Sequence, residues 1–146
     1  MRLISRVNKI IVHCSASDAP ADDSIGAISA LHITPVSHDV RWNGRLIAGR
    51  GFDRIGYHYV ITKDGRMHKG RNEMYWGAHC YGQNHDSIAI CLTGNTRFTL
   101  AQFKSFFDLI DILKLKHDLK NSDIYGHYAF NSNKTCPNFG ANLINY

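Results

Sequence analysis

Three side chains of the sequence could together bind a metal ion. His13 ends the short apolar run Ile10–Val12, and His127 and Cys136 lie nine positions apart in one C-terminal loop. A His, His, Cys set gives Zn²⁺ three ligands and leaves the fourth tetrahedral position for water, which is typical of a catalytic site. Nine histidines and four cysteines allow many such trios. A His13 that caps a strand and a Cys136 that is a small buried hydrophobe are the alternatives.

Two further side chains could assist such a metal. Lys134 lies two positions before Cys136, so its ammonium could stabilise an oxyanion that develops on a carbonyl under attack. Tyr57 opens an expected strand, where its phenol could orient a water molecule or donate a hydrogen bond. The alternatives are a solvated surface lysine and a core tyrosine whose hydroxyl is satisfied.

Strands and helices are expected to alternate along the chain, because short β-branched runs are interleaved with helical periodicities. Thr99 and Gln102 fit a capping box at the start of the longest helix, whose apolar face runs from Phe103 to Leu113. A shorter helix is predicted over Ser24–Leu31. The expected buried strands are Ile10–Val12, Tyr57–Ile61 and Ser87–Leu92, with a last strand at Asp123–Tyr125.

Two turns predict antiparallel pairing within this pattern. Asn43-Gly44 separates the triplets Val40–Trp42 and Arg45–Ile47, which is a strong hairpin signal since both turn residues adopt positive φ. Asp64-Gly65 leads from one strand to a short partner near Met67. We therefore predict a single α/β domain with a central mixed β-sheet, helices on both faces and the metal site at the strand ends.

Composition limits the classes of protein to consider. The 146 residues suit one domain, and an apolar share of 44% excludes disorder. The net charge of +5 favours an anionic partner without choosing among nucleic acid, an anionic polymer and a membrane surface. No apolar run approaches the length of a membrane span. Arg6 and Lys9 interrupt the N-terminal segment, so no signal peptide is expected.

Several strings, taken in order, closely resemble the type-2 N-acetylmuramoyl-L-alanine amidases, a family that includes bacteriophage lysozyme-type amidases and peptidoglycan recognition proteins. The resemblance extends over nearly the whole chain, which makes chance a poor explanation. The matching strings are Ile10–Ala16, Gly56–Ile61, Asp64-Gly65, Gly70–Glu73, Gly77–His79, Asn84–Ile88, Gly126-His127 and Lys134–Phe139.

The resemblance assigns roles to residues of this sequence. It implies that His13, His127 and Cys136 bind Zn²⁺ and that Tyr57 and Lys134 are catalytic. It also implies that His79 and Asn84 line the substrate groove. Arg71 and Glu73 match the family as well, but an internal ion pair explains them equally simply.

The implied activity is zinc-dependent hydrolysis of the lactyl amide between N-acetylmuramic acid and L-alanine of peptidoglycan, by one amidase domain over 1–146. Peptidoglycan is then the partner, with no nucleic acid and no membrane span, and a monomer is expected. The protein would be made in the cytoplasm and would reach the cell wall after release or by another export route.

One stretch departs from the family pattern. The segment between the first helix and Tyr57 is longer than in a typical member, so we expect a hairpin-like insertion at about 33–50. We hypothesise that this hairpin is a flap beside the substrate groove, with Trp42 available to stack on sugar. A surface loop without function is the alternative.

Three other functions compete with the lytic amidase. A recognition domain that binds peptidoglycan without cutting it would be expected to lack the cysteine ligand or the tyrosine. A cytoplasmic amidase that recycles muropeptides would fit the missing signal peptide, although the cysteine ligand resembles the phage branch more. A basic nucleic-acid binder would need a recognised motif or a clustered basic stripe, and the sequence has neither.

Overall fold

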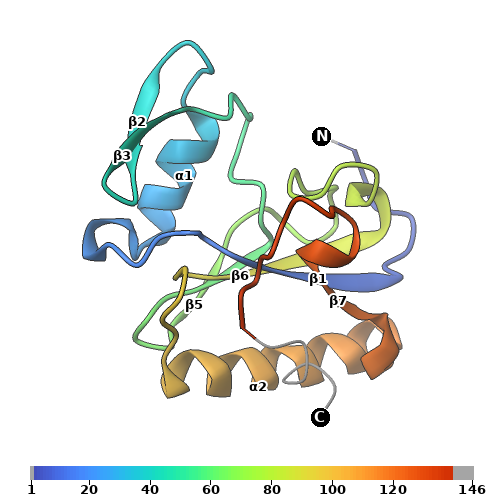
Figure 1. Cartoon of the computed structure of the whole chain (residues 1–146). Helices are drawn as coiled ribbons and strands as arrows, with labels where there is room; N and C mark the ends of the chain where they lie inside the picture. The colour runs from blue at the N-terminus through green and yellow to red at the C-terminus, as the bar shows by residue number, and fades with distance from the viewer. Residues whose placement is uncertain (1, 140–146) are drawn as a thin grey trace.

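The computed structural model describes residues 2–139, and a five-stranded sheet lies at its centre (Figure 1). The strand order is β5-β4-β6-β1-β7. β1 pairs in parallel with both β6 and β7, and β4 pairs in parallel with β6, whereas β4 and β5 are antiparallel. This pairing confirms the predicted mixed sheet. The strands are β1 (Lys9–Cys14), β4 (Tyr59–Ile61), β5 (Met67–Lys69), β6 (Ser87–Leu92) and β7 (Ile124–Gly126).

One face of the sheet is covered by the long helix α2 (Leu100–His117), seen below the sheet in Figure 1. The predicted capping box is present, because the Thr99 side chain accepts from the Gln102 backbone while the Gln102 side chain accepts from the Thr99 backbone. The apolar face of the helix packs on alternate residues of the central strands, and Phe106 and Leu113 are each 1% exposed. Burial of this face, more than helix propensity, stabilises the helix.

The opposite face is covered by α1 (Ile25–Ile33) and by a hairpin of β2 (Asp39–Trp42) and β3 (Arg45–Ala48). Ser24 caps α1 by accepting the Ala27 N–H. The hairpin turn has φ of 51° at Asn43 and 75° at Gly44, which confirms the expected turn. Helices therefore lie on both faces of the sheet, as predicted (Figure 1).

Element boundaries differ little from the sequence expectations. The strand expected from Tyr57 begins at Tyr59, and α1 extends two residues beyond Leu31. The sequence also predicts a short C-terminal helix or turn after Pro137, and this segment lies largely outside the described residues. Within residues 2–139, no helix has the length and apolar character needed to cross a membrane. Four short 3-10 helices complete the structure: Pro20–Asp22, Asn84–Asp86, Asn121–Asp123 and His127–Ala129.

The carboxylate of Asp18 ties together the loops that follow β1 and β6. It accepts the backbone N–H groups of Asn95, Thr96 and Arg97 at 2.9, 2.9 and 3.3 Å, and the Lys63 ammonium at 3.0 Å. Burial alone would raise the pKa of Asp18, but these hydrogen bonds outweigh it and hold the pKa well below its usual value. The ionised carboxylate is thus the form that the fold requires.

Acid should therefore weaken the protein through Asp18. A carboxyl whose pKa is lowered by folding contributes stability that is present above its unfolded pKa, about 3.9, and is lost as pH falls through the folded pKa. We expect Asp18→Asn to lower the free energy of unfolding at pH 7 by about 1–3 kcal/mol, since it loses charge-assisted hydrogen bonds. Its stability should also fall less steeply below pH 4 than that of the wild type. Urea titrations at several pH values measure both.

The exposed Asp111 of α2 provides the matched control, because Asp111→Asn removes the same charge outside this network. Equal acid sensitivity of Asp18→Asn and the wild type would contradict the role given to Asp18.

Candidate metal centre and active site

The pairing of β1 with β7 brings the two candidate histidine ligands together. Val12 and Gly126 are partners in this parallel pair, so the next residues of the two strands, His13 and His127, emerge side by side at the same edge of the sheet. Their ring centroids are 4.6 Å apart. Residues that are far apart in the sequence thus become neighbours through strand register.

Cys136 reaches these histidines through the loop that follows β7. The Tyr128 N–H donates to the Cys136 carbonyl at 3.1 Å, which folds the loop back on itself. The Cys14 N–H donates to Cys136 Sγ at 2.9 Å. The ligand atoms of His13, His127 and Cys136 all lie within 4.8 Å of one another. The structure therefore brings the predicted trio together.

The chemistry of this donor set fits zinc. Two imidazole nitrogens and one sulfur are ligands that Zn²⁺ prefers, and three protein ligands leave a fourth position open. His13 is 1% exposed, while His127 and Cys136 are partly exposed, so the trio is covered from one side only. An ion held here would be reachable by a substrate.

Burial keeps the histidines of this region neutral. Burial, together with His79 and His127, lowers the pKa of His13 well below its usual value. Burial and the nearby Lys134 lower the pKa of His127. Neutral imidazoles have the lone pair that a metal needs. A hydrogen bond with the Cys14 thiol, together with burial, raises the pKa of Cys136, so metal binding must displace its proton.

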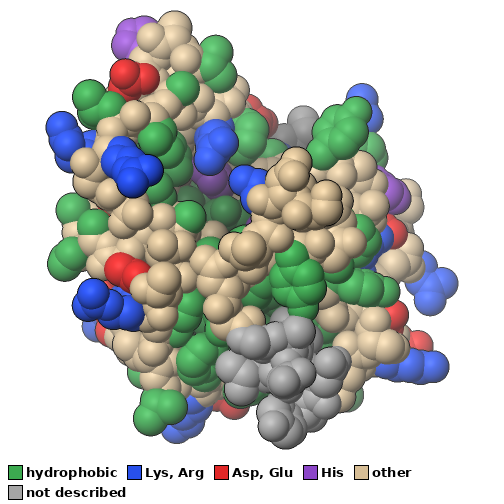
Figure 2. Space-filling model, in the orientation of Figure 1, with side chains coloured by type: hydrophobic (Ala, Val, Ile, Leu, Met, Phe, Trp, Pro, Cys, Tyr) green, Lys and Arg blue, Asp and Glu red, His purple; other side chains and the backbone are tan. Residues whose placement is uncertain are grey.

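Tyr57 and Lys134, the predicted catalytic residues, both lie near the trio. The Tyr57 ring centroid is 5.1 Å from that of His13. Burial raises the pKa of Tyr57 well above its usual value, so its hydroxyl keeps its proton. The exposed Lys134 is close enough to lower the pKa values of His13 and His127 by charge repulsion. Figure 2 shows a hollow in this face, with histidine and basic side chains exposed in and around it.

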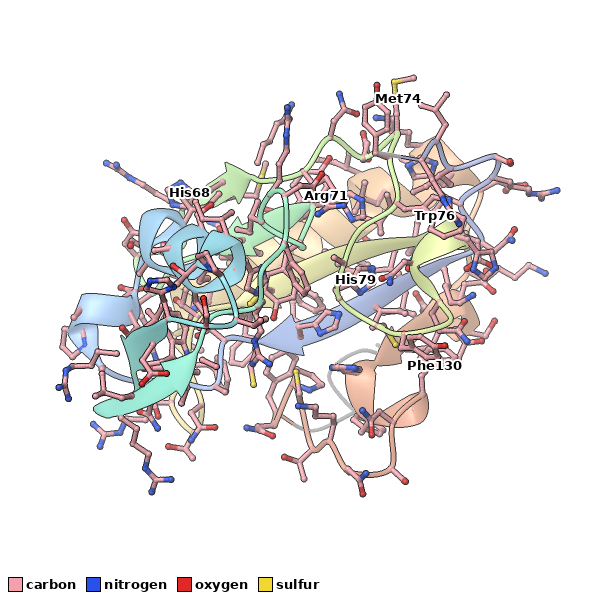
Figure 3. The ribbon with its side chains drawn as sticks, turned by 90° about the horizontal axis from the view of Figure 1, so that it is seen from above. His68, Arg71, Met74, Trp76, His79 and Phe130 are labelled. Carbon is pink, nitrogen blue, oxygen red and sulfur yellow. The ribbon has the colours of Figure 1, made fainter. Side chains whose placement is uncertain are left out.

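His79 contacts the trio through His13, whereas Asn84 contacts the backbone of His79, and both use polar atoms within the protein. His79 Nδ1 is 2.9 Å from His13 Nε2, and His79 Nε2 is 3.1 Å from Ser87 Oγ. Asn84 Oδ1 accepts the backbone N–H groups of His79 and Cys80 at 3.0 and 3.1 Å. Figure 3 shows His79 over the central strands. The sequence indicated that these residues belong to the site. It could not predict their contacts, because it does not show how the loop that carries them packs against the strands.

Trp42 differs from the expectation of an exposed stacking surface. Its side chain is 6% exposed and packs with Ile28 and Leu31 of α1. The indole N–H donates to the Ser15 carbonyl at 2.8 Å, so both the ring and its polar edge are used inside the protein. In this arrangement Trp42 is not available to sugar. The hairpin's role as a flap stays a prediction.

The expected ion pair between Arg71 and Glu73 is not formed. Arg71 pairs with Asp53 at 3.1 Å and also donates to three backbone carbonyls, those of Ile55, Trp76 and Arg54. Glu73 instead pairs with Lys116 and His117 at the end of α2. There it lines a cavity of about 570 Å³ beside the N-terminal segment, whose lining includes none of the metal trio. Arg71 thus contacts the segment before β4, whereas Glu73 contacts the C-terminal end of α2.

Known proteins that are similar to this chain in sequence or fold include bacterial and phage amidases and peptidoglycan recognition proteins. The endolysin of Escherichia phage T7 is 30% identical over 138 residues, covering 89% of this chain and 80% of that protein. Peptidoglycan-recognition protein SC2 of Drosophila melanogaster is 32% identical over 99 residues, covering 65% of this chain and 52% of that protein.

Solved structures agree with the sequence relatives. The endolysin amidase LysCS from Clostridium intestinale superposes with a TM-score of 0.75 at 26% identity, over 99% of this chain and 86% of that one. For the Ph2119 endolysin of a Thermus scotoductus phage the TM-score is 0.76 at 21% identity, over 98% and 86% of the two chains. The fold and the site thus define an amidase-type α/β domain.

A third comparison settles the family. The profile of the N-acetylmuramoyl-L-alanine amidase family matches residues 4–139, which is nearly all of the described chain. The protein belongs to this family and is an enzyme of the amidase class.

The burial of Trp42 predicts an effect on stability and not on substrate affinity. Trp42→Phe keeps an aromatic ring but leaves the Ser15 carbonyl without its donor, so we expect the free energy of unfolding to fall by about 1–3 kcal/mol. KM for the cell-wall substrate should stay within about twofold of the wild-type value, because the buried Trp42 ring offers no surface to the substrate. Denaturant titration and turbidity assays measure the two quantities. A raised KM with unchanged stability would restore the sugar-stacking hypothesis.

Proposed function

We propose that the protein is a zinc-dependent N-acetylmuramoyl-L-alanine amidase that cuts the lactyl amide between N-acetylmuramic acid and L-alanine in peptidoglycan. The observation that carries the proposal is the convergence of His13, His127 and Cys136, with ligand atoms within 4.8 Å of one another. Membership of the amidase family and similarity to proteins named endolysins support the substrate class.

The metal would supply the part of the chemistry that the side chains cannot. Zn²⁺ held by His13, His127 and Cys136 would provide a Lewis acid and an activated water at neutral pH. The protein's share is to present two neutral imidazoles and one thiolate at a sheet edge that is open on one side. One chain supplies all three ligands, so the site needs no residue from a partner subunit.

Lys134 and Tyr57 have complementary tasks in this proposal. The Lys134 ammonium stabilises negative charge as it develops on the oxygen of the amide carbonyl under attack. Burial raises the pKa of Tyr57, so its hydroxyl keeps its proton at neutral pH and can donate a hydrogen bond. It is therefore suited to orient the carbonyl or the attacking water by a hydrogen bond.

The names of the sequence relatives indicate where the enzyme acts. The curated relatives that match most of the chain are named endolysins, and we propose that this protein likewise acts on the cell wall. Its net charge of +5 would favour association with an anionic wall polymer. A role in wall lysis, more than in recycling soluble fragments, follows from this similarity.

Digestion of purified peptidoglycan tests the reaction and its metal requirement together. The expected products, identified by mass spectrometry, are stem peptides that begin with L-alanine and glycan strands that remain intact. A strong chelator should abolish release, and added Zn²⁺ should restore it, because the three ligands need a metal to act. Cleaved glycan strands with intact lactyl amides would contradict the amidase activity. Full activity after verified metal removal would contradict the zinc requirement but not the amidase activity.

Replacing Lys134 tests the source of charge stabilisation. Lys134→Met should lower kcat by about 10²–10³-fold, the usual cost of removing one electrostatic donor to a developing oxyanion. Zinc content should be unchanged, since Lys134 is not among the ligands. Lys104→Met removes an equally exposed lysine on the outer side of α2 and should leave kcat unaltered. If both variants behave alike, Lys134 has no special place in the reaction.

A further inference from the structure

His79 connects the metal trio to a partly buried series of hydrogen bonds. His13 Nε2 lies 2.9 Å from His79 Nδ1, and His79 Nε2 lies 3.1 Å from Ser87 Oγ. Ser87, the first residue of β6, is fully buried, and its hydroxyl donates to the Gln83 carbonyl at 2.7 Å. Four groups are therefore joined in a row, from a backbone carbonyl to a candidate metal ligand.

The donor and the acceptor of each hydrogen bond in this series follow from the Gln83 carbonyl at its end. A carbonyl oxygen can only accept, so the single hydroxyl proton of Ser87 is committed to Gln83. Ser87 must then accept from His79, which places the His79 proton on Nε2. A neutral imidazole has one ring proton, so His79 Nδ1 is an acceptor, and the bond to His13 requires a proton on His13 Nε2. His13 Nδ1 is left with the lone pair.

We propose that His79 is a positioning residue, which selects the tautomer and fixes the ring orientation of His13 so that Nδ1 is offered to the metal. This inference rests on the proposed function, because it assumes that His13 is a metal ligand. A ligand histidine commonly donates its second N–H to a carboxylate, a carbonyl or a water, and this contact orients the ring and raises its basicity. Here a second imidazole is the acceptor.

The same contacts argue against a direct role of His79 in holding substrate. Both ring nitrogens of His79 are engaged within the protein, one by His13 and the other by Ser87. Neither is left to bond a sugar or a peptide. In this proposal His79 acts behind the metal site, and its place in the lining of the substrate groove stays a prediction.

Asn84 builds the loop that holds this chain in place. Its side-chain oxygen accepts the N–H groups of His79 and Cys80, and the Gln83 N–H donates to the Cys80 carbonyl at 3.0 Å. The same turn thus carries the His79 ring at one end and the Gln83 carbonyl at the other. Asn84 acts on the metal site by shaping this turn, with its amide oxygen already used.

Imidazole ¹⁵N NMR spectra test the tautomers directly in the wild-type protein. In the metal-free protein, His79 should show a protonated Nε2 and an unprotonated Nδ1, and His13 should show a protonated Nε2. With zinc added, the His13 Nδ1 resonance should shift while its Nε2 proton remains. A His79 proton on Nδ1, or zinc bound through His13 Nε2, would overturn the proposal. This measurement needs no variant and no catalytic activity.

Zinc affinity, measured by competition with a chromophoric chelator, tests the energetic consequence. His79→Leu fills similar space without an acceptor and should weaken zinc binding about 10–100-fold, the usual effect of losing such an outer contact. His79→Gln keeps a side-chain oxygen able to accept from His13 and should recover most of the affinity. His85→Leu, at an exposed histidine of the same segment, is the matched control and should bind zinc like the wild type.

The outcomes separate this inference from the proposed function. If the wild type fails to bind zinc at all, the proposed function fails. If the wild type binds zinc and His79→Leu, shown to be folded by circular dichroism, binds it equally well, only the role of His79 fails. If His79→Leu does not fold, the comparison of His79→Gln with the wild type and the wild-type tautomers decide the question.

Discussion

The parallel pairing of β1 with β7 is the interaction on which the rest of the site depends. It sets Val12 opposite Gly126 and so delivers His13 and His127 to the same edge. Because successive side chains of a strand point to opposite faces, a register shift of one residue would turn one histidine away from the other. Cys136 then needs only a short loop to join them, guided by the Cys14 backbone N–H. The centre is thus a product of sheet geometry.

The histidines at this edge of the sheet are held in their neutral form. Burial lowers the pKa of His13, His79 and His127, and charge repulsion from neighbouring basic groups lowers each pKa further. The result is a set of lone pairs held in place before any metal arrives. Lys134 adds a positive charge from the exposed side, so the site combines a neutral interior with a cationic entrance.

Sequence reasoning succeeded where the signal was local or repeated. Continuous apolar runs marked β1 and β6, and the Thr99–Gln102 box marked the start of α2. The trio was one of many possible sets by spacing alone, and it gained weight only from the ordered family strings. The structure then supplied what spacing lacks, namely the strand register that joins Ile10–Val12 to Ile124–Gly126.

The errors of the sequence reading have physical causes. Trp42 lies between Arg41 and Asn43 in the β2–β3 hairpin, and its sequence does not tell which face of a two-stranded hairpin is covered. Arg71 and Glu73 are close in sequence, yet each found a partner from a distant segment. The His79 contact had no sequence signal, because it joins a loop to a strand 66 positions earlier. All three depend on tertiary contacts.

The hairpin of β2 and β3 has one further consequence. It pairs only with itself, and it is fastened by inward contacts, from the Trp42 indole to Ser15 and from the Asn43 N–H to Asp22 at 2.8 Å. Its other side is open, with Leu46 61% exposed. The hairpin is therefore held on one side by contacts with the rest of the domain, while its other side faces solvent. Substitutions on the solvent side would change the surface of the protein without touching the contacts that hold the hairpin.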